Sequence, residues 1–251
     1  MSNDFKQEKI VFYTLMTDDY YDKIGTIFIN SFKKFHPDIE MVVYRQEMID
    51  EVLKEREIVF EVAKPIFAKL LVDSYDLVVN MDADTIITGR LEEVLKNDYE
   101  VGSVVQLCDI CKRGIIENVT KEMYVQSGMV ASRNKRLWDI WEEANIKNMK
   151  DFYVKYQFRD QDILNLVWYN DPEVSKMKRK VFDKDKDCYG AKFLGREKEF
   201  YIEGDKLMCR GERVLCYHHA RGPCINDKLQ FDKMEFTPGV IKYLNNIAQG
   251  N

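Results

Sequence analysis

Hydrophobic and polar positions along this chain follow two periods in alternation, one typical of strands and the other of helices. Short apolar runs rich in β-branched residues predict strands at 9–15, 40–44, 77–81 and 100–106. Segments with apolar residues near helical spacing predict helices at 21–35, 48–56, 66–75 and 91–96. Strands that alternate with helices are typical of a parallel sheet with helical crossovers, so we expect an α/β fold.

The second half of the chain continues this alternation with less regularity. Its predicted elements are a strand–Ser-Gly–strand segment at 123–131, helices at 135–146, 160–169 and 238–247, and a strand at 214–217. The charge-dense stretch 171–187 has weak periodicity, so we expect a solvated excursion there rather than part of a site. Because no repeat, low-complexity tract or linker interrupts the chain, residues 1–251 are predicted to form one domain.

Two aspartates, Asp82 and Asp84, follow the strand predicted at 77–81. That strand is almost entirely apolar, as expected for a strand buried on both faces at the centre of a sheet. Ligands bind open α/β sheets beyond the carboxyl ends of their strands, where this pair falls. Two carboxylates held together repel each other unless a cation lies between them, and oxygen ligands suit Mg²⁺ or Mn²⁺ shared with a substrate phosphate. The pair indicates metal-dependent phosphate or diphosphate chemistry, although a simple polar turn would give the same pattern.

The composition and net charge of the chain limit the kinds of molecule that it is expected to bind. A hydrophobic content of 45% fits a globular protein with a sizeable core. The net charge of −5 and the lack of a basic stripe argue against nucleic-acid binding. The polar start and the lack of a long apolar stretch predict neither a signal peptide nor a membrane span, so we expect a cytoplasmic protein without evident membrane association. Cys108 and Cys111 have the spacing of half a zinc site, but no second C-x-x-C follows, so isolated reduced thiols are predicted.

Two further motifs bear on the metal hypothesis. Asp160 and Gln161 begin the helix predicted at 160–169, where an acidic residue is favourable. His219 follows the strand predicted at 214–217 in the pattern H-x-x-G-P. Imidazole is a competent third ligand for an Mn²⁺ ion already held by carboxylates. We expect the neighbouring His218 to be a surface or core residue without a role in the site.

With these motifs the chain resembles the retaining family 8 glycosyltransferases, the glycogenin and lipopolysaccharide galactosyltransferase group. The resemblance runs in order over most of the chain. The matching segments are T-L-M-T-D-D-Y-Y at 14–21, F-A-K-L at 67–70, V-N-M-D-A-D-T at 79–85, Q-S-G-M at 126–129, D-Q-D-I-L-N at 160–165 and H-A-R-G-P at 219–223. The matches at 79–85 and 160–165 are the most specific.

The resemblance implies a GT-A fold, a single Rossmann-like domain with a mixed, mostly parallel central sheet flanked by helices. It implies transfer of a hexose from a UDP-sugar to an acceptor hydroxyl with retention of anomeric configuration, the acceptor being a glycan, a lipid-linked sugar or a protein. It makes Asp82, Asp84 and His219 the ligands of Mn²⁺ (or Mg²⁺), and it places Asp160 and Gln161 near the anomeric carbon. The other donor contacts that it implies are Thr14, Thr17, Asp18, Tyr21, Lys69, Ala83, Ser127, Gly128 and Gly222.

The chain departs from the family pattern at three places. Asp18 and Gln126 each replace an asparagine of the family. The K-P-W that follows H-x-x-G-P in the family is missing, and Cys224 takes its first position. Because that lysine neutralises the diphosphate, Arg221 or Lys228 is expected to substitute for it.

Two other functions stay open from the sequence. Haloacid-dehalogenase-type phosphatases carry D-x-D-x-T after an apolar strand, with the first aspartate as nucleophile and the second as acid/base, and M-D-A-D-T satisfies this pattern. That alternative gives no role to His219 or to the motif at 160–165. The third hypothesis is a GT-A-like protein that binds a nucleotide sugar without turnover. The missing K-P-W favours it, whereas the intact metal ligands argue against it.

Overall fold

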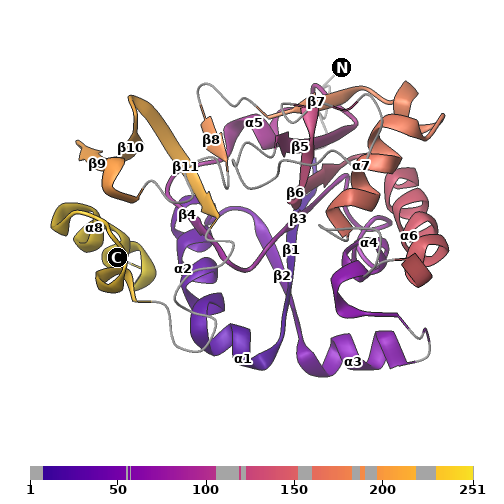
Figure 1. Ribbon diagram of the computed structural model, residues 1–251, viewed down its shortest axis with the longest axis horizontal. Coiled ribbons are helices and arrows are strands. Elements are labelled where there is room, and N and C mark those ends of the chain that lie inside the picture. The colour runs from indigo at the N-terminus through magenta and orange to yellow at the C-terminus, as the bar shows by residue number, and fades with distance from the viewer. Residues whose placement is uncertain are drawn as a thin grey trace, which may run out of the picture.

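Figure 1 shows a computed structural model of the chain, whose central feature is a six-stranded sheet. The structure describes residues 8–54, 56, 58–105, 119, 123–151, 160–182, 187–189, 197–218 and 230–250. The strand order of the central sheet is β2-β1-β3-β6-β5-β7. Its strands are β1 (Ile10–Met16), β2 (Glu40–Arg45), β3 (Leu77–Met81), β5 (Val101–Val105), β6 (Val125–Ser132) and β7 (Arg179–Val181).

Neighbouring strands of this sheet run both parallel and antiparallel. β1 pairs in parallel with β2 and β3, and β5 pairs in parallel with β7 at one edge. β6 is antiparallel to both β3 and β5. The predicted α/β fold with a mixed, mostly parallel central sheet flanked by helices is therefore confirmed.

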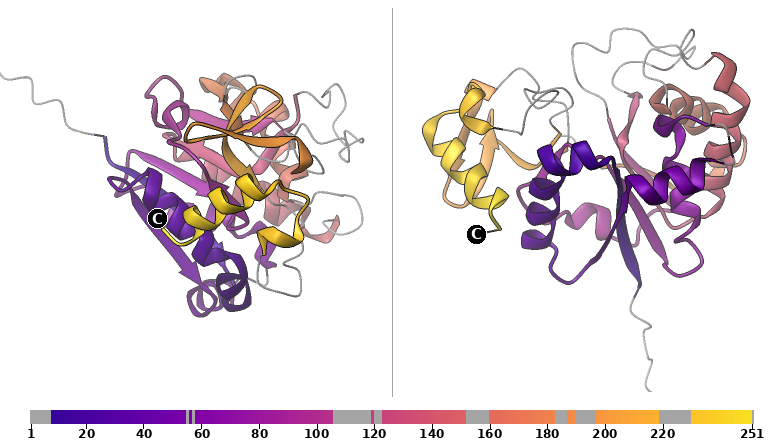
Figure 2. Two further views of the ribbon diagram at one scale, coloured as in Figure 1. Left: turned by 90° about the vertical axis from the view of Figure 1, so that its left-hand side faces the viewer. Right: turned by 90° about the horizontal axis from the view of Figure 1, so that it is seen from below.

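Helices cover both faces of the central sheet and bury its middle strands along their whole length (Figures 1 and 2). On one face lie α3 (Gln46–Lys54), α4 (Lys64–Lys69), α6 (Arg136–Asn148) and α7 (Asp160–Asn170). On the other face lie α2 (Thr26–Phe35) and α5 (Glu92–Leu95). Trp138 and Trp141 of α6 are completely buried in the first of these layers. They are core residues, as bulky aromatic side chains at helical spacing predict.

A second sheet lies beside the central one and consists of short strands. Its order is β4-β11-β10-β9, and β8 pairs in parallel with β11. Its strands are β4 (Thr85–Ile87), β8 (Asp187–Tyr189), β9 (Phe200–Glu203), β10 (Lys206–Cys209) and β11 (Glu212–His218). The C-terminal helix α8 (Pro238–Ala248) packs against this sheet through Val240, Leu244 and Ile247 (Figure 2). Only β11 was predicted, because runs of three or four residues are too short to show a period.

Two stretches differ from the sequence predictions. Within the predicted excursion at 171–187, residues 171–182 are largely exposed, but they contribute β7 to the central sheet and bury Val174 and Phe182. These two apolar side chains anchor the charged segment at the edge of the central sheet. The helix predicted at 66–75 is shorter, since α4 begins at Lys64 and gives way to turns after Lys69.

Candidate active site

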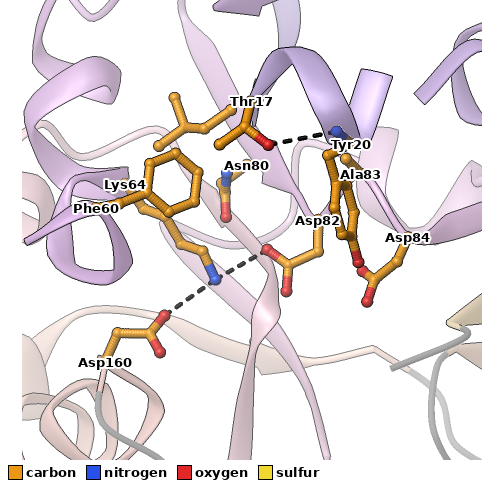
Figure 3. Close-up of a pocket in the computed structure, with 10 residues that line it drawn as sticks. Thr17, Tyr20, Phe60, Lys64, Asn80, Asp82, Ala83, Asp84 and Asp160 are labelled. Carbon is orange, nitrogen blue, oxygen red and sulfur yellow. Dashed lines mark hydrogen bonds and ion pairs between the residues drawn. The ribbon is translucent and has the colours of Figure 1, made fainter. Parts of the chain in front are cut away.

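A pocket lies beyond the carboxyl ends of β1 and β3, at the edge of the central sheet where ligand binding was predicted (Figure 3). Its cavity volume is about 290 Å³. Its walls come from the segments that follow β1 and β3 and from the first residues of α4 and α7. The lining residues are Leu15, Thr17, Tyr20, Phe60, Lys64, Asn80, Asp82, Ala83, Asp84 and Asp160.

Asp82 and Asp84 lie in the tight turn that connects β3 with β4. β4 leaves the central sheet and pairs with β11 in a register that sets Thr85 opposite His218. This pairing brings His218 Nε2 to 3.0 Å from Asp84 Oδ1 and 3.8 Å from Asp82 Oδ2. The junction of the two sheets thus assembles two carboxylates and an imidazole from distant parts of the chain.

These three side chains fit a divalent metal ion. One potential ligand atom from each lies within 4.8 Å of the other two. Carboxylate oxygens suit Mg²⁺ and Mn²⁺, and an imidazole nitrogen is better suited to Mn²⁺. Gly128 leaves room for the cluster, because a Cβ atom there would lie 2.9 Å from His218 Cε1 and 3.1 Å from Asp82 Oδ2.

The histidine in this cluster is not the one that the sequence analysis chose. His218 is the last residue of β11, and its side chain is 9% exposed. The predicted ligand His219 lies outside the described residues. The role of His219 therefore stays a prediction. The sequence signal for His218 was the pair of histidines after a late strand.

The charges of the cluster influence one another strongly. Burial raises the pKa of Asp82 above its ordinary value, and it prevails over the opposing charge of Lys64. Burial acts in the same direction on Asp84, but the charge of His218 and its hydrogen bond hold the pKa of Asp84 below the ordinary value. The pKa of His218 is raised in turn, because Asp84 outweighs the effect of burial on the imidazole. Additional positive charge at this cluster would therefore stabilise the ionised form of Asp82.

Lys64, the first residue of α4, places its ammonium group between two carboxylates (Figure 3). Its Nζ lies 2.8 Å from Asp82 Oδ1 and 3.0 Å from Asp160 Oδ2, and it donates to the carbonyl oxygen of Ser127 at 3.3 Å. Burial lowers the pKa of Lys64, but the two carboxylates reverse this effect and raise the pKa above its ordinary value. A positive charge at a helix N-terminus is unfavourable because it opposes the helix dipole. The presence of a lysine at this position is therefore explained by its contacts in the pocket and not by helix stability.

Lys69, the lysine that the resemblance assigned to the donor, lies outside the pocket. Its Nζ pairs with Glu142 at 2.7 Å and with Asp139 at 3.0 Å, both on α6. Five residues along a helix correspond to about 140° around its axis, so Lys64 and Lys69 face different ways. The sequence analysis missed Lys64, whose signal was its place directly before Pro65, at the start of a helix.

Asp160 and Gln161 begin α7, as the sequence predicted. The side chain of Asn165 fixes this end of the helix to β6. Its Oδ1 accepts a hydrogen bond from the backbone N–H of Val125 at 2.8 Å, and its Nδ2 donates to the carbonyl oxygens of Val125 at 2.7 Å and Gln161 at 2.8 Å. Gln161 is buried and accepts a hydrogen bond from the N–H of Ser127 at 3.4 Å. Asp160 lines the pocket, whereas Gln161 does not.

The opening motif contributes to the pocket through Thr17 and Tyr20. Thr17 Oγ1 accepts a hydrogen bond from the N–H of Tyr20 and caps the short helix α1 (Asp18–Tyr20). Asp18 pairs instead with Arg45 at 2.6 Å, and the ring of Tyr21 stacks on the same guanidinium.

The predicted donor contacts divide into three groups. Thr17, Asp82, Ala83 and Asp84 line the pocket. Those that do not line it are Thr14, Asp18, Tyr21, Lys69, Ser127 and Gly128. Arg221, Gly222 and Lys228 lie outside the described residues.

Comparison with known proteins identifies the fold. No protein-family description matches the chain, and no curated protein matches its sequence. Among solved structures, it is similar to the galactosyltransferase LgtC in complex with donor and acceptor sugar analogues, with a TM-score of 0.57 and 14% identity over 95% of both chains. It is also similar to the bifunctional glycosyltransferase WbbM, with a TM-score of 0.60 and 14% identity over 98% of this chain and 50% of that one. This chain thus spans about half the length of WbbM.

A third similar structure is mouse xyloside xylosyltransferase 1, with a TM-score of 0.52 and 11% identity over 86% of this chain and 98% of that one. All three structures are glycosyltransferases. In the described part of the chain, no helix is long and apolar enough to cross a membrane. The chain has the GT-A fold of these glycosyltransferases, with an Asp-Asp-His cluster that fits a metal ion at the carboxyl edge of its central sheet.

Proposed function

We propose that this protein is a metal-dependent glycosyltransferase that moves a hexose from a UDP-sugar to an acceptor hydroxyl with retention of anomeric configuration. The observation that carries the proposal is the cluster of Asp82, Asp84 and His218 beside a pocket at the carboxyl edge of the sheet. The fold supports the reaction class, and the motifs of the family 8 enzymes support the donor and the stereochemistry. The acceptor is proposed to be a glycan, a lipid-linked sugar or a protein.

Asp82, Asp84 and His218 would hold Mn²⁺ or Mg²⁺ through their oxygen atoms and an imidazole nitrogen. When bound, such an ion supplies a Lewis acid that neutralises the negative charge developing on the departing diphosphate. Lys64 adds a positive charge of the protein's own at the same pocket. Arg221 and Lys228 are proposed to provide further positive charge in place of the missing family lysine.

The reaction exchanges one bond at the anomeric carbon for another. The bond from C1 of the sugar to the diphosphate oxygen breaks, the acceptor oxygen bonds to C1, and the proton of the acceptor hydroxyl passes to the departing diphosphate. Positive charge develops at C1 as the diphosphate leaves. Asp160 is proposed to stabilise this charge, because its carboxylate lines the pocket and Lys64 holds it in place at 3.0 Å. Gln161 is proposed to position Ser127 and the pocket wall through its hydrogen bond.

The nucleotide and metal requirements can be tested by thermal shift on the full chain with UDP, GDP, CDP and ADP, each with and without Mn²⁺. A ligand that binds only the folded state stabilises it by about 2.7 kcal/mol at a hundred times its Kd. We expect UDP to raise the melting temperature selectively and only with Mn²⁺. Asp84→Asn should abolish this response, whereas Asp73→Asn, which alters an exposed carboxylate, should retain it.

The outcomes separate the alternatives. Absence of any nucleotide response in folded protein at saturating Mn²⁺ would overturn the transferase proposal. A UDP response that persists unchanged in Asp84→Asn would overturn the metal assignment. A protein that binds without turnover would show the UDP response but release no UDP when incubated with Mn²⁺, UDP-sugars and a panel of acceptors. The fold favours the transferase proposal over the phosphatase alternative, because it is similar to the folds of solved glycosyltransferases.

A further inference from the structure

Gln126 contacts the imidazole of His218 on the side away from the carboxylates. Its side chain is buried in β6, and its amide nitrogen lies 2.7 Å from His218 Nδ1. The other ring nitrogen, Nε2, lies 3.0 Å from Asp84 Oδ1. Both nitrogens of the imidazole are therefore engaged, and the ring is fixed between β6 and the aspartate turn.

A shift in strand register places Gln126 at the ring. Ser103 of β5 is paired with Val130 of β6, but the next residue of β5, Val104, is paired with Gln126. Residues 127–129 of β6 therefore have no partner in β5 and form a bulge in the β5–β6 pairing. The hydroxyl of Ser103 lies 2.8 Å from the carbonyl oxygen of Gln126 and 3.0 Å from that of Met129, and it joins the two ends of the bulge. Irregularities of this kind redirect side chains next to functional sites.

The hydrogen bond at Nδ1 decides which nitrogen of a neutral His218 carries the proton. If the amide N–H of Gln126 donates to Nδ1, the proton is on Nε2, which then donates to Asp84. If the amide is turned by 180°, its oxygen accepts from Nδ1–H, and Nε2 presents a lone pair to the carboxylates. An amide can serve both arrangements because its nitrogen and oxygen exchange places with little change in shape.

We propose that Gln126 is a positioning residue for the metal ligand His218: its side-chain oxygen accepts a hydrogen bond from Nδ1–H, which holds the ring and leaves Nε2 free to coordinate. This inference rests on the metal site of the proposed function. Partners of a ligating histidine orient the ring, and their loss typically weakens metal binding by 10- to 100-fold.

Mn²⁺ affinity tests this role, measured on the full chain from the electron paramagnetic resonance signal of the free ion. Gln126→Met keeps the approximate volume but removes both hydrogen-bonding groups, and we expect Mn²⁺ to bind roughly ten-fold more weakly. Gln126→Glu keeps acceptors for Nδ1–H, so its affinity should equal or exceed that of the wild type. The control Ser132→Ala removes a buried hydroxyl at the far end of β6 and should leave the affinity unchanged.

A second measurement reports the proton directly. Nitrogen chemical shifts of the histidine rings in the Zn²⁺-loaded protein, a diamagnetic substitute, should show the proton of His218 on Nδ1 in the wild type and in Gln126→Glu. The role of Gln126 would be overturned if all variants bound Mn²⁺ with equal affinity, or if Gln126→Met and Gln126→Glu weakened Mn²⁺ binding equally. Either result would leave the metal site itself unaffected. If the folded wild type binds no Mn²⁺, the proposed function fails together with this inference.

Discussion

Lys64 determines the charge of the pocket before any ligand arrives. Its ammonium group lies between Asp82 and Asp160 and offsets the repulsion between the two carboxylates. A metal ion at Asp82 and Asp84 would share the Asp82 carboxylate with this lysine. Positive charges on both sides of one carboxylate repel each other, so the lysine and the metal ion compete, although both favour a bound diphosphate.

Replacing the lysine should therefore change metal and nucleotide binding in opposite directions. In Lys64→Met we expect Mn²⁺ to bind about ten-fold more tightly, because a repulsive charge is gone, and UDP to bind about ten-fold more weakly. Mn²⁺ titration by electron paramagnetic resonance and UDP titration at saturating Mn²⁺ measure the two affinities. Lys64→Arg keeps the charge and serves as the matched control. A parallel loss of both affinities would show that the lysine merely maintains the shape of the pocket.

Helix α7 shows how one polar side chain can place a whole element. Asn165 makes three hydrogen bonds from the helix, two of them to the backbone of Val125 in β6. Because Asn165 is fully buried, the backbone groups it contacts have no access to replacement water. The position of Asp160, one turn earlier on the same helix, depends on this attachment.

Removal of that attachment should destabilise the protein and impair the site together. Asn165→Ala leaves the N–H and C=O of Val125 without partners, so we expect the free energy of unfolding to fall by about 2 kcal/mol. Urea denaturation measures the loss. Asn170→Ala alters an exposed asparagine at the end of the same helix and should change stability by less than about 0.5 kcal/mol. Equal effects of the two substitutions would contradict a specific role for the buried amide.

The elements of the central sheet could be predicted because each carries a long periodic pattern. β3 was predicted with its observed bounds, since all five of its residues are buried and four of them are apolar. The strands of the second sheet could not, because β4 and β9 have only three and four residues. β4 depends on its pairing with β11, and β9 depends on its pairing with β10 and on packing against α8, and no local pattern records these contacts.

The candidate site was predictable where its residues adjoin a strong strand or helix. Asp82, Asp84 and Asp160 follow or begin such elements, and all three line the pocket. The sequence offered no basis for choosing between neighbouring residues of one type. α4 carries two lysines, and two histidines are adjacent at the end of β11. The rotation of the helix and the register of the strand decide which of these residues faces a ligand. Those are fixed by tertiary packing, and local sequence does not encode them.

At the scale of the whole molecule, the helical layer over one face of the central sheet is tied to the region before α5 by a buried histidine. His36 ends α2, its ring stacks on Phe32, and its Nε2 accepts a hydrogen bond from the N–H of Leu91 at 3.0 Å. Burial lowers the pKa of His36 to about 4, and the charge of Arg90 acts in the same direction. The imidazole must be neutral to accept this hydrogen bond.

This histidine should make the fold sensitive to mild acid. Above pH 6.5 the imidazole is neutral in both folded and unfolded chains, so it contributes no pH dependence. Between pH 6.5 and about 4, the unfolded chain takes up a proton that the folded one excludes, and the free energy of unfolding falls by about 3 kcal/mol. His36→Gln keeps an acceptor without a titrating group and should lack this decrease. Urea denaturation of both proteins across this pH range makes the comparison, and identical pH profiles would contradict it.

The ammonium group between Asp82 and Asp160 also bears on how the protein acquires its metal ion. A chain that needs a bound ion to neutralise buried carboxylates folds only when the ion is supplied, as small zinc domains do. Here Lys64 supplies an internal cation, whose Nζ lies 2.8 Å from Asp82 Oδ1. With the metal site proposed above, we therefore expect the chain to fold whether or not Mn²⁺ is supplied. Chelation of Mn²⁺ should then remove nucleotide binding and leave the fold intact.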